Sequence, residues 1–250
     1  MAMRNVKLTI AYDGSDYHGW QVQPGLPTVQ ETIQDAVRSL LGSDVRLFGA
    51  SRTDSGVHAL GQAGLIQIDS PVPTKNLARA ITGRLPKDIA IVKAEDVRMG
   101  FDVIGEVTNK LYRYTIFCGS VRPVLQRRTC WHLTSRLDAG AMHVAAQVLV
   151  GKHDFKSFAS AADKRTNSVR TVFRCDVTAK SDDQGQWVYV DVEGDGFLYN
   201  MVRNIVGSLV EVGQGRWRPE KIGEALQAQN RTAAGPIAPP NGLCLMWIQY

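Results

Sequence analysis

Apolar and polar side chains alternate near the start of the chain. Val6, Leu8, Ile10 and Tyr12 occupy every second position of residues 6–12, with polar or small residues between them. This period of two is typical of a strand that buries one of its faces. We therefore predict a half-buried strand over residues 6–12.

The pattern changes to a helical period after residue 28. Apolar residues recur every three or four positions between Val29 and Leu41, which predicts an amphipathic helix. Thr28 and Glu31 have the spacing of a capping box at its start, and Gly42 is a suitable residue to end it. The same reasoning along residues 1–104 predicts the order β-α-β-β-α-β, with strands at 6–12, 45–48, 65–68 and 89–93, and helices at 28–41 and 74–82.

The second half of the chain repeats this order of elements. We expect strands at 111–118, 169–179, 187–193 and 243–250, and helices at 137–150, 199–212 and, as an addition, 219–226. Two β-α-β-β-α-β units predict an α+β protein with two ferredoxin-like halves, 1–104 and 105–250, and mainly antiparallel sheets. Such pairs of sheets can flank a central cleft, although element order alone does not establish a function.

The composition is that of a folded protein in a reducing compartment. Hydrophobic residues make up 44% of the chain and charged residues 21%, and the four cysteines are widely spaced with no Cys-x-x-Cys pair. Neither a zinc site nor a disulfide framework is predicted. No apolar run approaches the ~18 residues of a membrane span, so we expect a cytoplasmic protein without a membrane partner.

The positive charge is concentrated in one stretch. Residues 1–104 carry 11 Lys/Arg and 11 Asp/Glu, whereas residues 110–174 carry 12 Lys/Arg against three acids. A local surplus of this kind fits a surface that contacts a phosphate backbone. A solvated basic face explains it equally well.

Residues 49–62 are the most unusual segment. Small residues surround one carboxylate (Asp54), one guanidinium (Arg52) and one imidazole (His58), with no apolar periodicity. Such a loop leaves room for a ligand to approach the backbone. Asp-Ser-Gly is also ordinary turn chemistry, in which Asp54 has only a structural role.

Four blocks of sequence carry a resemblance to a known family. They are the run Gly-Ala-Ser-Arg-Thr-Asp-Ser-Gly-Val-His-Ala at 49–59, the first strand and its loop at 6–23, Lys-Leu-Tyr-Arg-Tyr at 110–114, and the helix segment at 197–207. In this order, spanning nearly the whole chain, they resemble the TruA family of tRNA pseudouridine synthases. At 101–105, where relatives commonly carry His-Ala-Arg, this chain has no basic residue, so no basic RNA contact is predicted there.

The resemblance implies a pseudouridine synthase fold and an isomerase that needs no cofactor or metal. It identifies Asp54 as the nucleophile, acting at C1′ or C6 of uridine or through a glycal-like intermediate. Arg203 is then the cation that keeps Asp54 ionised, Tyr112 stacks on the target uracil, and Arg52 fills the space left by the flipped base. The first half would carry the catalytic loop, and the second half the Arg203 helix and the basic RNA-binding surface.

The family's substrate is uridine at positions 38–40 of the tRNA anticodon arm, and its members act as homodimers. We expect both for this chain, and treat His58 as loop structure and Tyr114 as a core residue. The candidate phosphate contacts are Arg122, Arg127, Arg128, Lys152, Lys156, Lys164, Arg165 and Arg170. Two alternatives are a non-catalytic RNA-binding protein with ferredoxin-like domains and a nucleoside hydrolase, although a hydrolase usually needs a second paired acid.

Overall fold

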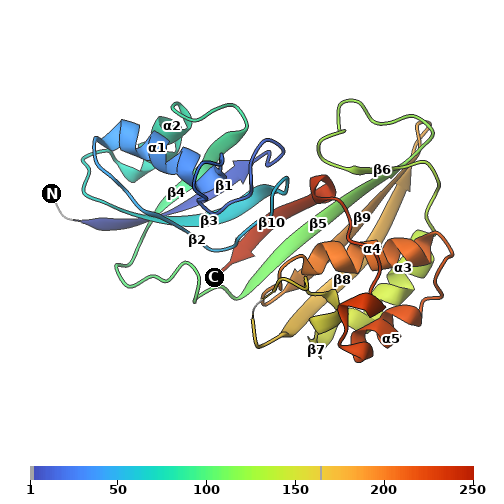
Figure 1. Cartoon of the computed structure of the whole chain (residues 1–250). Coiled ribbons are helices and arrows are strands. Elements are labelled where there is room, and N and C mark those ends of the chain that lie inside the picture. Colours follow the sequence, from blue (N-terminus) through green and yellow to red (C-terminus); the bar gives the residue numbers. More distant parts are fainter. Residues whose placement is uncertain (1–2, 164) are drawn as a thin grey trace. The chain divides into compact units, whose positions relative to one another are not determined.

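The computed structural model describes residues 3–163 and 165–250, which form two compact units (Figure 1). Unit 1 comprises the chain up to Thr108 together with Leu245–Tyr250, and unit 2 comprises Asn109–Cys244. The expected halves, 1–104 and 105–250, differ from this division mainly at the C-terminal end. Residues 245–250 belong to unit 1 because their backbone lies against the strand that contains Gly61: a Cβ added at Gly61 would lie 2.5 Å from the Met246 carbonyl oxygen.

Unit 1 has the predicted element order. Its strands are β1 (Arg4–Tyr12), β2 (Leu47–Gly49), β3 (His58–Ile68) and β4 (Ile89–Val97), and its helices are α1 (Val29–Leu41) and α2 (Thr74–Thr82). β1 pairs antiparallel with both β3 and β4, and β2 pairs antiparallel with β3. The alternation of residues 6–12 reflects burial, since Val6, Leu8 and Ile10 are completely buried.

Two details of unit 1 differ from the predictions. The capping box is wrong, because the Thr28 hydroxyl is buried without a hydrogen-bond partner in the described structure and Thr28 O instead accepts from the Thr32 hydroxyl at 2.9 Å. β3 begins at His58 rather than near residue 65, so half of the predicted loop is strand. The helix end at Gly42 is confirmed, with φ at +70°.

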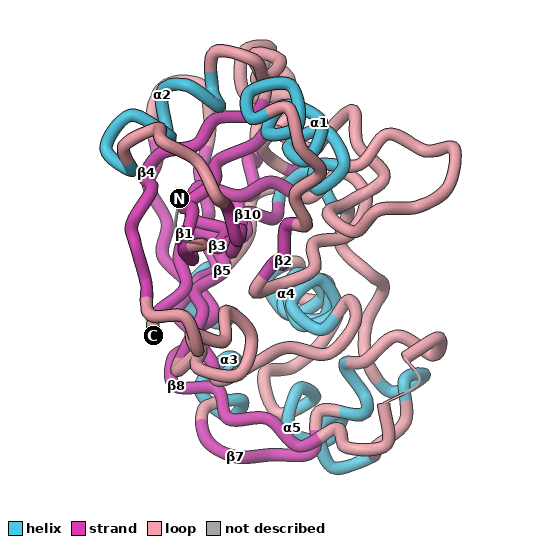
Figure 2. Tube along the Cα trace, turned by 90° about the vertical axis from the view of Figure 1, so that its left-hand side faces the viewer, coloured by secondary structure: helices cyan, strands magenta, loops and turns pink. Residues whose placement is uncertain are grey.

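Unit 2 contains a second mainly antiparallel set of strands. The strands are β5 (Asn109–Cys118), β6 (Trp131–Leu133), β7 (Gly151–Asp154), β8 (Val169–Ser181) and β9 (Gln186–Gly194), with β10 (Leu243–Gln249) starting at its end. The order is β5-β9-β8-β7 with antiparallel neighbours, and β6 pairs in parallel with β5. The helices are α3 (Ala139–Ala146), α4 (Met201–Gly213) and α5 (Lys221–Ala228). Figures 1 and 2 both place α5 beside β7 at one end of this unit.

The predictions for unit 2 missed its shortest strands. β6 and β7 have three and four residues, too few to show a period. The predicted helix 137–150 is divided into α3 and a 3₁₀ turn at Gln147–Leu149. No helix in residues 3–163 or 165–250 has both the length and the apolar character needed to cross a membrane.

Helix α4 is buried on almost all sides. Eleven of its thirteen residues are buried, and the remaining two are Arg203 and Glu211. The predicted start of this helix at residue 199 is wrong, because α4 starts at Met201 and Tyr199, before it, is 45% exposed. The loop after α5 crosses α4 at Gly207, where an added Cβ would lie 1.7 Å from the Pro236 carbonyl oxygen.

Candidate active site

Asp54 lies in a tight turn between β2 and β3. The Val57 N–H donates to the Asp54 carbonyl at 3.1 Å, and Gly56 has φ at +77°, which suits a glycine at the third position of a turn. The predicted turn therefore exists, and its closing hydrogen bond uses the backbone of Asp54. The side chain of Asp54 is partly exposed, as a group that meets a substrate must be.

Two glycines allow the N-terminal loop to lie directly behind this turn. A Cβ at Gly14 would lie 2.0 Å from the Val57 carbonyl oxygen, and one at Gly19 would lie 2.6 Å from that of Thr53. Gly19 also has φ at +88°, a conformation that favours glycine. Thr53 is held by the Trp20 N–H, which donates to its carbonyl at 3.1 Å, and by its hydroxyl contact with the Tyr12 hydroxyl at 2.8 Å.

A buried amide fixes the other side of the loop. Gln62 is completely buried, and its amide accepts from the Ser51 N–H at 3.2 Å and donates to the Ser51 carbonyl at 2.6 Å. Both backbone groups of Ser51 are thus satisfied by one side chain, as a buried peptide group requires. The loop before Asp54 is held by an amide whose role the sequence did not indicate.

His58 has a structural role, as expected. Its ring is 5% exposed, and Nδ1 accepts a hydrogen bond from the Gly14 N–H at 3.1 Å. The same nitrogen lies 3.1 Å from Asp13 Oδ1. His58 joins the N-terminal loop to β3.

Arg52 is the exposed cation of the loop. Its side chain makes no hydrogen bond or ion pair with any residue that the structure describes, and it precedes Asp54 by two positions. An exposed guanidinium of this kind is available to a ligand.

The segment that lacks the basic residue of the relatives has a packing role. Val103 is 2% exposed and packs with Ala50 and Ala63, and Phe101 covers this cluster. The Tyr250 hydroxyl donates to the Val103 carbonyl at 3.0 Å. Hydrogen bonds from the backbone N–H groups of Gly105 and Ile104 lower the pKa of Asp102. The ionised Asp102 carboxylate therefore stabilises the adjoining turn. This segment supports the start of the Asp54 loop from behind.

Tyr112 and Tyr114 lie on the same face of β5 in unit 2. Tyr112 is 6% exposed, and its ring packs against Phe197 in a T-shaped contact at a centroid distance of 5.2 Å. Tyr114 is completely buried and donates its hydroxyl to the Pro239 carbonyl at 2.7 Å, and burial raises its pKa far above the usual range. Tyr114 is therefore a core residue, as expected.

Arg203 is held by side-chain and backbone contacts in unit 2. Its Nε donates to the Ala238 carbonyl at 2.8 Å, and its own carbonyl accepts from the Ala238 N–H at 3.2 Å. One terminal nitrogen donates to Asn200 Oδ1 at 3.0 Å, and Asn200 precedes α4 with φ at +62°. These contacts fix the position of the guanidinium. An arginine at the edge of a helix whose guanidinium merely extends into solvent would not need them.

The candidate phosphate contacts of unit 2 are mostly exposed, namely Arg122, Arg127, Arg128, Lys152, Lys156 and Arg165. Some of them also bind protein groups: Arg165 pairs with Asp163, Arg127 donates to the Val124 carbonyl at 3.0 Å, and the half-buried Arg170 donates to the Val169 carbonyl at 2.6 Å. Lys164 lies outside the described residues. Within those residues, no three His, Cys, Asp or Glu side chains are grouped as a metal would need.

Comparison with known proteins identifies the family. The tRNA pseudouridine synthase family matches residues 8–104 and 145–250. The chain belongs to the tRNA pseudouridine synthases. Among proteins named tRNA pseudouridine synthase A, that of Acetivibrio thermocellus is 43% identical and that of a Thermoanaerobacter species 40% identical, each over 99% of this chain and 100% of the relative. That of a Geobacter species is 41% identical over 99% of both chains.

The matched segments of this tRNA pseudouridine synthase include three of its candidate site residues. Arg52 and Asp54 lie in the first segment and Arg203 in the second, whereas Tyr112 lies between them and within the full-length matches. The pseudouridine synthase fold predicted from the sequence is confirmed by the family and by the mixed, mainly antiparallel architecture. Sequence reasoning missed Gln62, Asn200 and Asp163, whose roles depend on tertiary contacts and leave no periodic pattern.

Proposed function

We propose that this protein converts uridine to pseudouridine at positions 38–40 of the tRNA anticodon arm, with Asp54 as the nucleophile. Family membership supports the reaction. The assignment of Asp54 rests on its place in a turn. The residues before it, Thr53 and Ser51, are both held by hydrogen bonds to other parts of unit 1. An enzyme that positions a reacting group gains rate through such prior ordering.

The reaction rearranges bonds without a redox change. The N1–C1′ bond of uridine breaks, a C5–C1′ bond forms, C5 loses a proton and N1 gains one. The ionised Asp54 carboxylate acts either as a nucleophile at C1′ or C6, or as the anion beside a glycal-like intermediate. Cleavage at C1′ has oxocarbenium character, which a nearby carboxylate stabilises.

Arg203 serves in this proposal as the cation that favours the ionised form of Asp54. A guanidinium lowers the pKa of a nearby carboxyl and opposes the effect of burial. The anchoring of Arg203 by Ala238 and Asn200 supports this role, because it fixes where the positive charge is presented. The proposal requires Arg203 and Asp54 to act on the same uridine.

Tyr112 and Arg52 are proposed to bind the substrate. The target uridine must leave its stack at a cost of a few kcal/mol, and aromatic stacking and an inserted side chain both offset that cost. Tyr112 supplies a ring that packs against Phe197, and Arg52 supplies an exposed guanidinium.

We further propose that the protein is a homodimer acting in the cytoplasm and that the tRNA lies across both subunits. The exposed arginines and lysines of unit 2 suit contacts with RNA phosphates. A non-catalytic RNA-binding role would require these basic residues but would not require an acid at position 54.

The test is the release of tritium from tRNA labelled at uracil C5. Asp54→Asn should lower the rate on the order of 10⁴-fold or more, as expected when the central reacting group is removed. Binding of tRNA by the variant should persist, and modification mapping of tRNA treated with the parent should place pseudouridine at 38–40. Equal rates for Asp54→Asn and the parent would refute the assignment.

A further inference from the structure

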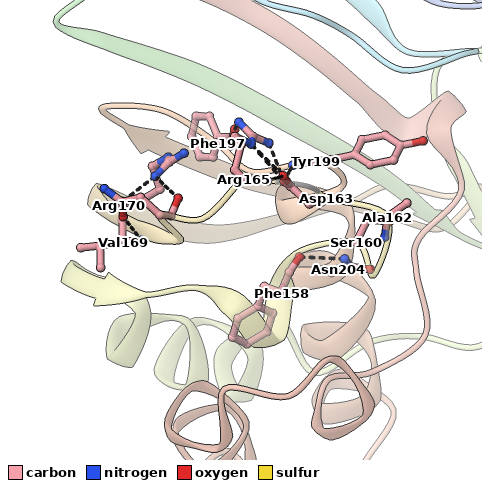
Figure 3. A network of polar contacts seen from close by, with 11 residues as sticks. Phe158, Ser160, Ala162, Asp163, Arg165, Val169, Arg170, Phe197, Tyr199 and Asn204 are labelled. Carbon is pink, nitrogen blue, oxygen red and sulfur yellow. Dashed lines mark hydrogen bonds and ion pairs between the residues drawn. The ribbon is translucent and has the colours of Figure 1, made fainter.

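An ion pair in unit 2 joins two connections that are distant in the sequence. Arg165 donates through Nε to Asp163 Oδ1 at 2.9 Å and through one terminal nitrogen to Oδ2 at 2.6 Å (Figure 3). Its other terminal nitrogen donates to the Phe197 carbonyl at 3.0 Å. The guanidinium therefore links Asp163 to the segment that precedes α4.

Asp163 makes the same link from the other side. Its Oδ2 accepts from the Tyr199 N–H at 2.8 Å, and the Ser160 N–H donates to the Tyr199 carbonyl at 2.8 Å. The carboxylate is 7% exposed, and the Arg165 guanidinium holds its pKa well below the usual range. The pair thus remains ionised at neutral pH, with both of its members bonded to the 197–199 backbone.

The linked segment adjoins two residues of the proposed site. The Phe197 ring packs against Tyr112 with an interplanar angle of 87°, and Asn200 accepts a hydrogen bond from Arg203. A movement of residues 197–200 would therefore displace the support of the Tyr112 ring and one anchor of the Arg203 guanidinium.

We propose that Asp163 and Arg165 are positioning residues for the reaction, which fix residues 197–200 and through them Tyr112 and Arg203. The inference rests on the proposed function. It assigns Arg165 a role within the protein rather than on the RNA phosphates, because three of its donors are already bonded to Asp163 and Phe197.

Two substitutions of opposite charge separate these roles. Arg165→Gln removes a positive charge and Asp163→Asn removes a negative one, so their electrostatic effects on RNA binding should be opposite. A positioning pair predicts the same outcome for both: kcat at saturating tRNA falls at least about tenfold, while the tRNA Kd and its salt dependence stay within about twofold. Arg165→Lys keeps the charge but loses the bidentate geometry, and should have an intermediate rate.

Arg216 provides a matched control. It also pairs with a carboxylate in two places, with Glu211 at 2.5 and 2.6 Å, and lies beyond the far end of α4. Arg216→Gln should leave the rate within about twofold. Thermal melts of all variants identify any loss of folding, and in that case Phe197→Leu alone should reproduce the fall in kcat.

The readouts distinguish the inference from the function it rests on. If Arg165→Gln weakens tRNA binding with a salt slope lower by about one and kcat is unchanged, Arg165 is a phosphate contact and the inference is overturned. Opposite effects of Arg165→Gln and Asp163→Asn would overturn it as well. An inactive parent would remove the function and the inference together, whereas an active parent with unaffected variants would remove only the inference.

Discussion

The two units hold their functional segments in different ways. In unit 1, Gly14 and Gly19 bring the backbone so close to the Asp54 turn that no side chain fits between them. In unit 2, the surroundings of Tyr112 and Arg203 are fixed by charged and amide side chains, among them Asp163, Arg165 and Asn200. Added atoms should therefore damage unit 1, whereas the removal of polar atoms should damage unit 2.

Arg203→Lys is the most severe test of the polar arrangement in unit 2. Lysine keeps the charge, but its ammonium cannot reproduce the planar donors that reach both Ala238 and Asn200. We expect kcat to fall about 10²–10³-fold, equivalent to roughly 3–4 kcal/mol of transition-state stabilisation, with tRNA binding retained. Single-turnover tritium release measures the rate, and Arg216→Lys is the control. A rate equal to that of the parent would show that charge alone is sufficient.

Gly19→Ala tests the close packing in unit 1. An alanine here must adopt the positive φ of Gly19, +88°, and its Cβ would lie 2.6 Å from the Thr53 carbonyl oxygen. We expect the free energy of unfolding, measured in urea, to fall by about 2–3 kcal/mol, since both backbone strain and overlap contribute. Activity should fall as well, because Thr53 adjoins Asp54.

Gly25→Ala is the matched control for this substitution. Gly25 has φ at +74°, but no atom lies within 4 Å of the position of its Cβ. Only the strain of the left-handed conformation applies, and the expected loss is about 1 kcal/mol. Equal losses for Gly19→Ala and Gly25→Ala would contradict the importance of the close approach.

The smallest expected effect concerns the pH dependence of unit 2. Burial and the positive charge of Arg165 lower the pKa of Lys110 from 10.5 to about 8. Between these values Lys110 binds a proton in the unfolded chain but not in the folded chain, so its contribution to the free energy of unfolding should rise with pH by on the order of 1 kcal/mol. Below about pH 8 Lys110 is charged in both states, and the penalty of burying it is fully present.

Chemical unfolding at pH 7.5 to 10.5 would detect this rise. Lys110→Met should abolish it, and Lys180→Met, on an exposed position of β8, should leave it unchanged. Arg165→Gln should shift the rise to higher pH, because Lys110 then loses the repulsion of one positive charge. The buried cysteines, whose pKa values burial raises, oppose the rise above about pH 9 in parent and variant alike, so the readout is the difference between the two proteins. A difference that does not change with pH would contradict the burial of a titrating amine.

The sequence was a good guide wherever a period repeats. The alternation at residues 6–12 and the helical spacing from Val29 correspond to β1 and α1, because each buries one face. β6 and β7 were missed because pairing with β5 and β8, rather than any property of their few residues, makes them strands.

Four blocks of sequence led to the candidate site residues. The residues that hold them in place could not be found in this way. Asp54 and Arg203 could be named because they lie in motifs, whereas Gln62 and Asp163 act on residues 11 and 36 positions away. Such contacts follow from the folded arrangement and have no local signature. Arg165 shows this most clearly, because its charge suggested an RNA contact and nothing in the sequence indicated its ion pair with Asp163.

The return of residues 245–250 to unit 1 has a consequence for synthesis on the ribosome. Unit 1 stays incomplete until the whole of unit 2 has been translated, because Tyr250 bonds to Val103 and Gln249 to Thr108. A nascent chain therefore exposes the apolar cluster around Ala50 throughout that interval. The Asp54 loop gains its final support only when Tyr250 has been translated.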